Sequence, residues 1–382
     1  MALDEAIHWN GFCELESEPA LFNVMLREFG VKGVKVQEVV SLDEDMMAIL
    51  NKPIYGLIFL SRWREDDPNK QEASCPEGLW FANQVWLTTA SNACATVALL
   101  NIVNNIEEID LGENLQHFKE FTMPFTPALR GDAVNNHEFI KRIHNSFARR
   151  MDLLKADHQL KAETAFRRSR TRHEQEDLDT AFHFIAYVAA LGKVWKFDGL
   201  ERQPQVLGSC QSSDDWLAQA KPDIFTRMKE YEEDQIEFSM LSLAQDPLPG
   251  LINRLAMNVK SLEMVNQCLT SKAGQLPFHA ITLKNTLLGP DKSYTLSRDM
   301  IDRAFIPTLQ EQEYQNCGVE KLKNLWHELA DSQRSLQASI REEQQSQQAD
   351  NEYAEGRRFD YSPAIRKWLR LLARKQVIEK LL

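Results

Sequence analysis

The chain has 382 residues and a formal net charge of −12, with 44 Lys and Arg against 56 Asp and Glu. Its hydrophobic share of 43 % and charged share of 26 % are ordinary for a globular protein, which excludes collagen-like, low-complexity and wholly disordered classes. At roughly 150 residues per domain, the length predicts two domains or three short ones. The acidic balance argues against a general nucleic-acid binder.

Secretory and membrane classes are not expected either. The start of the chain has no basic region followed by an apolar core, which predicts no secretory signal. Residues 78–106 lack charged side chains and are long enough to span a bilayer. They contain six Asn and Gln amides, too many for a lipid-facing helix, so we interpret them as part of a soluble core.

The cysteines and histidines predict no metal site and no disulfide framework. The six cysteines include no C-x-x-C pair, which fits a reducing compartment. The histidines also lack metal-ligand spacing. No metal or organic cofactor is therefore expected.

The first part of the chain predicts an α/β domain. Apolar periodicity predicts a helix at 18–28, and the short apolar run 54–60 predicts a buried central strand. A Ser-Asn pair precedes the apolar run 93–103, which predicts a buried helix with a capping residue at its start. A second amphipathic helix is expected at 137–151.

The charged segment 151–179 predicts a solvated helix or loop. Its arginines are followed directly by acids and no aromatic residues lie between them, so a nucleic-acid arm is not expected. Two strand-like segments, 183–189 and 193–198, follow around a Leu-Gly turn. A helix is then expected at 216–231 and a last strand at 236–243.

The pattern of the chain changes after residue 245. Residues 246–305 give no clear signal and are interpreted as a linker or insert. From residue 322, a broken heptad with Gln333 in its gap predicts a helix that packs on a partner helix. A Gln-rich break is expected at 344–348.

The last residues form a basic amphipathic segment. A Ser-Pro pair at 362–363 predicts the start of a final helix. Residues 357–382 hold eight Lys and Arg against two acids. Such a helix suits either docking to a protein or binding to a membrane surface.

Cys94 is a candidate nucleophile because of its place near a predicted helix start. The unpaired N–H groups and the positive end of the helix dipole favour a thiolate there. A cysteine protease also needs a base, a group that orients the base, and donors for the oxyanion. Without these partners, a buried structural cysteine remains the alternative.

The predicted hairpin supplies a histidine and a carboxylate. If Ala190 and Lys193 flank the turn, His183 faces Leu200 and Asp198 is its diagonal neighbour. A shift of one residue on each side makes His183 and Asp198 directly opposed. In both registers the two side chains point to one side of the sheet. They form either the base and orienting group of a catalytic triad or a surface His–Asp pair.

The chain resembles the ubiquitin C-terminal hydrolases, peptidase family C12, over about residues 8–245. The resemblance consists of five motifs in the family's order, which makes it specific. They are Phe-Cys-Glu-Leu-Glu-Ser-Glu-Pro at 12–19 with Phe-Gly-Val-Lys-Gly-Val at 29–34, Asn-Ala-Cys-Ala-Thr at 92–96, His-Asn-Ser-Phe-Ala-Arg at 144–149, Phe-His-Phe at 182–184 and Asp-Gly-Leu at 198–200.

This resemblance implies a fold, an activity and residue roles. The implied fold is an α/β papain-like cysteine protease fold, with a central antiparallel sheet flanked by helices. The implied activity is hydrolysis at the C-terminal glycine of ubiquitin, without a cofactor. By resemblance, Cys94 is the nucleophile, His183 the general base and acid, and Asp198 its orienting group. Segment 151–179 corresponds to the crossover loop beside or through which substrate passes.

One position departs from the family pattern. The family's oxyanion residue is a Gln about six residues before the Cys, because that donor must lie close to the developing charge. The matching residue is Gln84, and the step to Cys94 is ten. Residues 85–88 therefore resemble an insertion. Three alternatives are open for these four residues. They bulge out as a loop and leave Gln84 in place, or they displace Gln84 at a cost of about 10²–10³ in rate. The third alternative is an error in the predicted gene.

The C-terminal part resembles the extra α-helical domain of the long, proteasome-associated family members. The matching residues are Asn-Leu-Trp at 324–326 and the stretch 357–365. We expect a catalytic domain at 8–245, the linker or insert at 246–305 and a helical docking domain at 306–382. The implied partners are ubiquitin, its conjugates and a ubiquitin receptor of the proteasome regulatory particle, in cytoplasm and nucleus. Nucleic acid and membrane are not expected partners.

Two other functions compete with a deubiquitinase. The first is a catalytically weak ubiquitin-binding scaffold, docked to a large assembly by its C-terminal helices. The insertion after Gln84 is the feature that favours it. The second is an unrelated papain-like protease in which Cys94 cleaves ordinary peptides, but it would make five ordered motifs a coincidence.

Overall fold

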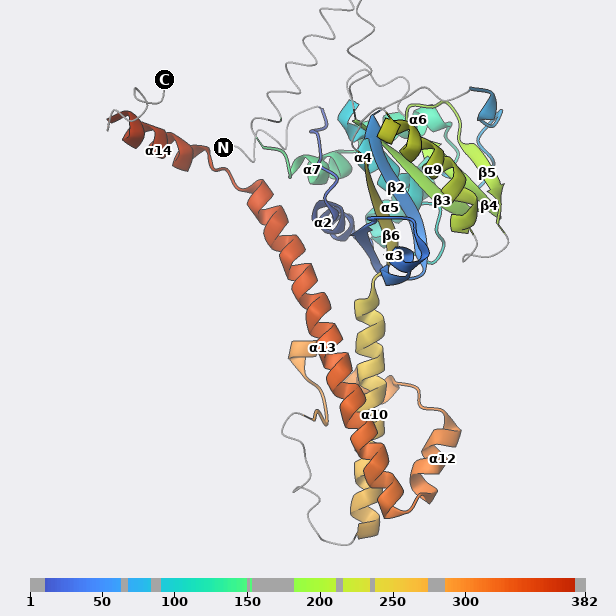
Figure 1. Ribbon diagram of the computed structural model, residues 1–382, viewed down its shortest axis with the longest axis vertical. Helices are drawn as coiled ribbons and strands as arrows, with labels where there is room; N and C mark the ends of the chain where they lie inside the picture. Colours follow the sequence, from blue (N-terminus) through green and yellow to red (C-terminus); the bar gives the residue numbers. More distant parts are fainter. Residues whose placement is uncertain are drawn as a thin grey trace, which may run out of the picture. The chain divides into compact units, whose positions relative to one another are not determined.

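The described part of the chain contains one antiparallel sheet, helices that border it, and the long helices α10 (Pro247–Ala273) and α13 (Val319–Arg358) (Figure 1). The computed structural model describes residues 11–62, 68–83, 91–149, 152, 182–210, 216–233, 238–273 and 286–374. The strands are β1 Val34–Glu38, β2 Ile54–Arg62, β3 Phe182–Ala190, β4 Lys193–Asp198, β5 Gln205–Ser209 and β6 Ser239–Gln245. The α-helices are α2 Pro19–Phe29, α3 Glu44–Ile49, α4 Cys94–Val103, α5 Gly112–Thr122, α6 Pro127–Asn136, α7 Glu138–Asn145, α9 Trp216–Glu233, α10 Pro247–Ala273, α11 Arg298–Arg303, α12 Thr308–Asn316, α13 Val319–Arg358 and α14 Ser362–Arg374.

The chain divides into two compact units. Unit 1 comprises residues 1–245 and 350–382, and unit 2 comprises residues 246–349. The first boundary follows residue 245, where the catalytic domain was expected to end. The expected docking domain 306–382 is divided between the two units, because α13 begins in unit 2 and its last residues belong to unit 1.

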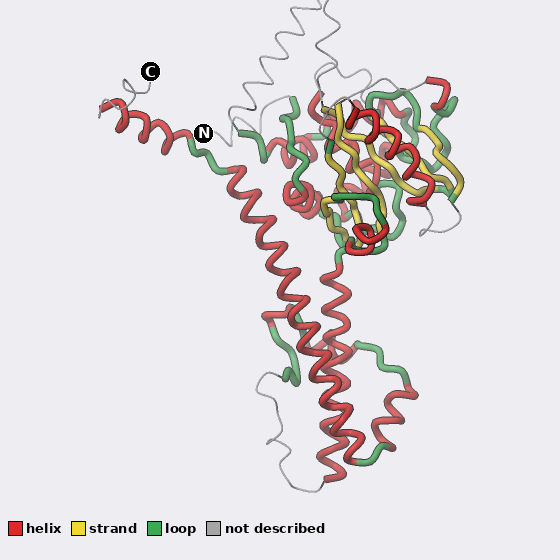
Figure 2. The backbone as a smooth tube through the Cα atoms, in the orientation of Figure 1, coloured by secondary structure: helices red, strands yellow, loops and turns green. Residues whose placement is uncertain are grey.

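The sheet of unit 1 has the strand order β1-β6-β2-β3-β4-β5, and all its neighbouring strands are antiparallel. The strands expected near 54–60, 183–189, 193–198 and 236–243 are β2, β3, β4 and β6. The short edge strands β1 and β5 were not predicted. Figure 2 shows the strands bordered by helices. This arrangement confirms the predicted α/β class with a central antiparallel sheet and a helical C-terminal extension.

Each face of the sheet packs on its own layer of helices. Ala186 and Val188 of β3 join a core with residues of α2, α4, α5 and α7. Ile185 and Tyr187, the alternate residues of the same strand, join a second core with residues of α3 and α9. Apolar side chains on both faces explain why β3 has a continuous apolar sequence, since it is covered on two sides.

Helix α4 is buried along its whole length. All ten of its side chains are buried, and the helix packs on β2, β3 and β4. The expected side-chain cap is wrong: the 3₁₀ turn Ser91–Ala93 leads directly into the helix, and no side chain caps it. No helix in the described ranges combines the length and apolar character that a membrane crossing requires.

Unit 2 contains a pair of antiparallel helices, α10 and α13. The range interpreted as a linker or insert contains the 27-residue helix α10. The predicted helix partner for the broken heptad is confirmed, because Leu336 and Ile340 of α13 pack on residues of α10. Gln333, in the gap of the heptad, donates to Oδ1 of Asn258 on α10 at 3.1 Å. Two polar side chains thus meet where both apolar stripes are interrupted.

The expected Gln-rich break at 344–348 is wrong. Helix α13 runs through this range without interruption. Glutamine is a good helix former, so a run of glutamines does not end a helix. Gln344 donates to the carbonyl oxygen of Ser293 at 2.9 Å, within unit 2.

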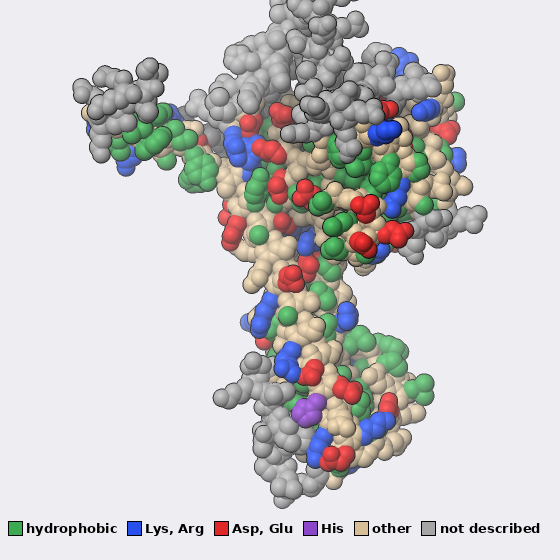
Figure 3. Space-filling view, viewed as in Figure 1, with side chains coloured by type: hydrophobic (Ala, Val, Ile, Leu, Met, Phe, Trp, Pro, Cys, Tyr) green, Lys and Arg blue, Asp and Glu red, His purple; other side chains and the backbone are tan. Residues whose placement is uncertain are grey.

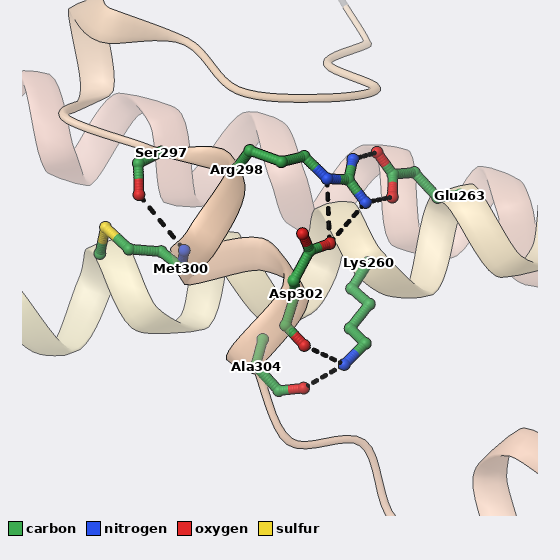
Figure 4. A network of polar contacts seen from close by, with 7 residues as sticks. All are labelled: Lys260, Glu263, Ser297, Arg298, Met300, Asp302 and Ala304. Carbon is green, nitrogen blue, oxygen red and sulfur yellow. Dashed lines mark hydrogen bonds and ion pairs between the residues drawn. The ribbon is translucent and has the colours of Figure 1, made fainter.

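Ion pairs and hydrogen bonds of charged side chains connect α11 to α10 (Figure 4). Arg298 pairs with both carboxylate oxygens of Glu263 on α10, at 2.6 and 3.0 Å, and with Asp302 one turn further along α11. Lys260 donates to the carbonyl oxygens of Asp302 and Ala304, at 2.8 and 2.6 Å. These carbonyls lie at the end of α11, where a cation is favoured by the helix dipole.

Within unit 1, two arginines at the end of α13 bind acidic residues from the first half of the chain. Arg357 is buried and pairs with Glu16 at 3.0 Å and with Asp152 at 2.9 Å. Arg358 pairs with both oxygens of Glu28 at 2.7 Å. Its guanidinium also lies over the Phe147 ring, 4.4 Å from the centroid.

A fully buried histidine connects three segments of unit 1. His144 of α7 shares a hydrogen bond of 2.7 Å between its Nδ1 and the hydroxyl of Thr96 in the first turn of α4. Its Nε2 lies 2.8 Å from the carbonyl oxygen of Cys13, which can only accept. Burial lowers the pKa of His144 to about 4, and the Cys13 carbonyl only partly opposes this. The imidazole is therefore neutral near pH 7.

The His144 contacts are expected to make unit 1 acid-sensitive. In the unfolded chain this imidazole titrates near its ordinary pKa of 6.5, against about 4 when folded. The free energy of unfolding should therefore fall as the pH drops from 6.5 to 4, by roughly 3 kcal/mol from this residue. Denaturant unfolding of wild type and His144→Gln across this range checks it. The variant should show a shallower pH slope.

The exposed His117 of α5 supplies a matched control, and His117→Gln should keep the wild-type slope. Equal slopes in wild type and His144→Gln would contradict the assignment.

Candidate active site

Cys94 is the first residue of α4. Its side chain is 6 % exposed, and the residues around it belong to the core between α4 and the sheet. No side chain caps this helix, so the positive end of its dipole lies at Cys94 without a capping group. A negative charge on the sulfur is favoured in this position.

The β3–β4 hairpin has one of the two registers allowed by the sequence. Ala190 pairs with Lys193 and Ile185 pairs with Asp198. His183, two residues before Ile185, is therefore the diagonal neighbour of Asp198 on the same side of the sheet. The alternative register, with the two residues directly opposed, is excluded.

His183 and Asp198 form a buried pair. Nε2 of His183 lies 2.6 Å from Oδ1 of Asp198, and both side chains are at most 5 % exposed. Burial by itself lowers the pKa of His183, but the charge and hydrogen bond of Asp198 raise it to about 10. A hydrogen bond and charge interaction with Cys94 add smaller contributions in the same direction. Since Asp198 occupies Nε2, Nδ1 is the ring atom left for Cys94.

Asp198 is held in its ionised form. Burial raises the pKa of its carboxyl, but the charge and hydrogen bond of His183 outweigh this and lower it below the ordinary value. The backbone N–H of Leu200 donates to the same oxygen, Oδ1, at 2.9 Å, and nearby Lys196 acts in the same direction. The carboxylate can therefore orient the imidazole and stabilise its protonated form.

The structure brings Cys94, His183 and Asp198 together in the order that a thiol hydrolase requires: nucleophile, base, orienting carboxylate. In the described ranges no three His, Cys, Asp or Glu side chains gather as a metal site would need. Gln84 and the range 85–88 lie outside the described residues. Of segment 151–179, only Asp152 is described.

Sequence patterns did not identify two asparagines of α4 and its C-terminal turn. Asn101 and Asn105 hydrogen-bond to the backbone of the segment that ends just before Gln84. The available signal was their spacing of four within an apolar helix, which places both amides on one face. From the sequence, the side-chain amides of Asn101 and Asn105 were used only as an argument against a membrane-spanning helix at 78–106.

The family model described as "Ubiquitin carboxyl-terminal hydrolase, family 1" matches residues 12–229. The chain belongs to this family. The resemblance based on the five motifs is confirmed, and the chain is a cysteine-type ubiquitinyl hydrolase by class.

Named relatives agree with this membership. The chain is 37 % identical over 267 residues to ubiquitin carboxyl-terminal hydrolase isozyme L5 of Dictyostelium discoideum, covering 69 % of this chain and 71 % of the relative. It is 36 % identical over 258 residues to ubiquitin carboxyl-terminal hydrolase ubh-4 of Caenorhabditis elegans, covering 67 % and 72 %.

A solved structure of the Trichinella spiralis UCH37 catalytic domain bound to ubiquitin vinyl methyl ester is also similar. It is 33 % identical with a TM-score of 0.48, and the match covers 62 % of this chain and 96 % of that one.

The charge of Asp198 is expected to control the protonation of His183. In Asp198→Asn the charge is lost and burial dominates, so the pKa of His183 should fall from about 10 to below its ordinary 6.5. A pH titration of the ring ¹⁵N signals measures this directly.

His144 serves as an internal control in the same spectra. It is fully buried but bonds Thr96 and Cys13, so its titration should be unchanged. A His183 titration that is the same in wild type and variant would refute the pairing.

Proposed function

We propose that this chain is a deubiquitinase that hydrolyses (iso)peptide, ester or thioester bonds at the C-terminal glycine of ubiquitin. The proposal rests mainly on one observation in a member of this family: His183 bonds Asp198 through Nε2 and interacts with Cys94 at a helix N-terminus. In this proposal Cys94 is the nucleophile, His183 the general base and acid, and Asp198 the orienting group.

The first half of the reaction forms a thioester. The Cys94 thiolate attacks the carbonyl carbon of the ubiquitin glycine, and the carbonyl oxygen takes up the negative charge. The raised pKa of His183 favours an imidazolium beside the thiolate. As the tetrahedral intermediate collapses, Nδ1 of His183 gives its proton to the leaving amine. The amine departs, and ubiquitin stays bound to the sulfur.

The second half releases ubiquitin. Neutral His183 takes a proton from a water molecule, which attacks the thioester carbon. The sulfur leaves as a thiolate, so Cys94 and His183 return to their starting charges. Asp198 keeps Nδ1 directed at the reacting atoms in both halves, because its own bond occupies Nε2.

Two donors are proposed for the oxyanion. One is the backbone N–H of Cys94, the first residue of α4. The other is the side chain of Gln84, proposed from the family resemblance. By analogy with other oxyanion holes, loss of one donor would cost about 10²–10³ in rate.

We propose that α14 docks on a ubiquitin receptor of the proteasome regulatory particle, and that the enzyme acts in cytoplasm and nucleus. None of the described side chains of α14 is buried. Ile365, Trp368, Leu369 and Leu372 have the spacing of one helix face. Figure 3 shows hydrophobic side chains gathered over α14. An exposed apolar face bordered by arginines suits a groove in an acidic partner.

A ubiquitin probe with a C-terminal electrophile is expected to form a single adduct, on Cys94. Peptide mapping of the labelled protein identifies the residue. Cys94→Ala should lose the adduct and all turnover but still bind ubiquitin, because the thiol contributes chemistry rather than binding area.

The buried Cys13 supplies a matched control. Burial raises the pKa of its thiol far above the ordinary range, so it should stay unlabelled, and Cys13→Ala should keep the adduct. Turnover by Cys94→Ala near the wild-type rate would refute the nucleophile. Ubiquitin binding by the wild type without an adduct would favour the scaffold function.

Trp368→Ala is expected to abolish co-purification with proteasomes while leaving hydrolysis of small ubiquitin adducts unchanged. A large exposed aromatic side chain is a frequent hot spot of binding energy, and loss of a hot spot costs about 2 kcal/mol or more, about 30-fold in affinity. Leu309→Ala, at an exposed leucine in unit 2, is the control and should still co-purify. Retained co-purification of Trp368→Ala would argue against docking through α14.

A further inference from the structure

Residues 79–83 form a segment whose backbone is bonded mainly by side chains rather than by a neighbouring strand. The segment belongs to none of the described strands. Its residues are nevertheless all buried. Buried backbone N–H and C=O groups must find partners, so the partners show what holds the segment in place.

One edge of the segment is bound to α4. The backbone N–H of Ala82 donates to Oδ1 of Asn101 at 2.9 Å, and Nδ2 of Asn101 donates to the carbonyl oxygen of Ala82 at 3.2 Å. Asn105 repeats this pair on Trp80, at 2.8 and 2.6 Å. The spacing of two along an extended chain matches the spacing of four along a helix, so both carboxamides imitate a paired strand.

The opposite edge is bound to α6. The buried guanidinium of Arg130 donates to the carbonyl oxygens of Leu79 at 2.9 Å and Phe81 at 3.4 Å. A Cβ at Gly131 would overlap the carbonyl oxygen of Asn83, so only glycine allows α6 to approach so closely. The segment is thus held from two sides.

The end of the segment is also fixed. The backbone N–H of Asn83 donates to the carbonyl oxygen of Pro127 at 3.1 Å. Its Nδ2 donates to the carbonyl oxygen of Arg202 at 2.9 Å, four residues after Asp198. The last described residue before Gln84 is therefore tied both to α6 and to the turn that follows the orienting carboxylate.

We propose that Asn101 and Asn105 are positioning residues for the hydrolysis: they fix the chain that leads into Gln84 to the helix that begins with Cys94. The inference rests on the proposed function, with Gln84 as oxyanion donor. Because α4 and its C-terminal turn carry both the nucleophile and the two amides, the end of segment 79–83, which leads into Gln84, is set relative to the sulfur by a rigid element.

This arrangement bears on the four extra residues at 85–88. They lie between Gln84 and Cys94 along the chain. The hydrogen bonds of Asn101 and Asn105 connect the two sides of that interval directly. Extra residues in the interval therefore do not lengthen the described connection between residues 79–83 and the helix that begins with Cys94.

The test uses the full chain and steady-state hydrolysis of a fluorogenic ubiquitin amide. Asn105→Leu, at a half-buried site, and Asn101→Leu, at a buried one, keep the side-chain size but remove the paired hydrogen bonds. We expect kcat to fall by about 10- to 100-fold, because a donor displaced by a fraction of an ångström loses transition-state contact. KM should stay unchanged. Alkylation of Cys94 by iodoacetamide, which needs no oxyanion donor, should also keep its wild-type rate.

Asn104→Leu is the matched control. Asn104 is buried on the same turn, but its Nδ2 bonds only the Leu100 carbonyl in the described contacts. This variant should keep its kcat within about twofold, since the segment 79–83 retains its hydrogen bonds.

A double-mutant cycle distinguishes positioning from general structural damage. In a Gln84→Ala background, Asn105→Leu should reduce kcat by less than about twofold further, because the donor it positions is already absent. Equal losses in both backgrounds would overturn the proposal, as would an unchanged kcat in the single Asn variants. If the wild type turns over substrate and Cys94→Ala does not, either of these results refutes the positioning role but leaves the proposed function standing. No turnover by wild type would refute the proposed function and the positioning with it.

Discussion

A helix with no exposed face must satisfy every polar group within the protein, and α4 is such a helix. Its ten residues are all buried, so Thr96 and Asn101 cannot be left without partners. Thr96 bonds His144 of α7, and Asn101 bonds the backbone of Ala82. The polar side chains of α4 consequently determine which other segments lie against it. These contacts also fix the position of the N-terminal end of α4, where Cys94 lies.

Burial and partner groups have opposite net effects on the pKa values of the two buried histidines, His144 and His183. Both histidines are removed from water, which disfavours the protonated ring. At His144 the partners are a hydroxyl and a carbonyl, and burial prevails. At His183 the partner is an ionised carboxylate, and the charge of Asp198 prevails. One residue type thus gives a neutral ring and a protonated ring within the same unit.

The long apolar strands and the site were predictable, but several connecting elements were not. The Leu-Gly turn restricts the β3–β4 hairpin to two registers, and both place His183 and Asp198 on one side of the sheet. The short edge strands β1 and β5 have too few residues for a clear period. Helix α10 did carry a signal, since Leu255, Leu262 and Leu269 are spaced by seven residues, but a proline-rich start hid it. Its pairing with α13 also depends on the Asn258–Gln333 contact, which no pattern in either helix alone contains.

The membership of residues 350–358 in unit 1 has a consequence for the order of folding during synthesis. Domains generally fold as their residues leave the ribosome, from the N-terminus onward. Glu16 and Glu28 emerge early, but Arg357 and Arg358 are translated more than three hundred residues later. Glu16, Glu28 and the Phe147 ring of the nascent unit therefore stay without these partners until residues 357 and 358 have been made.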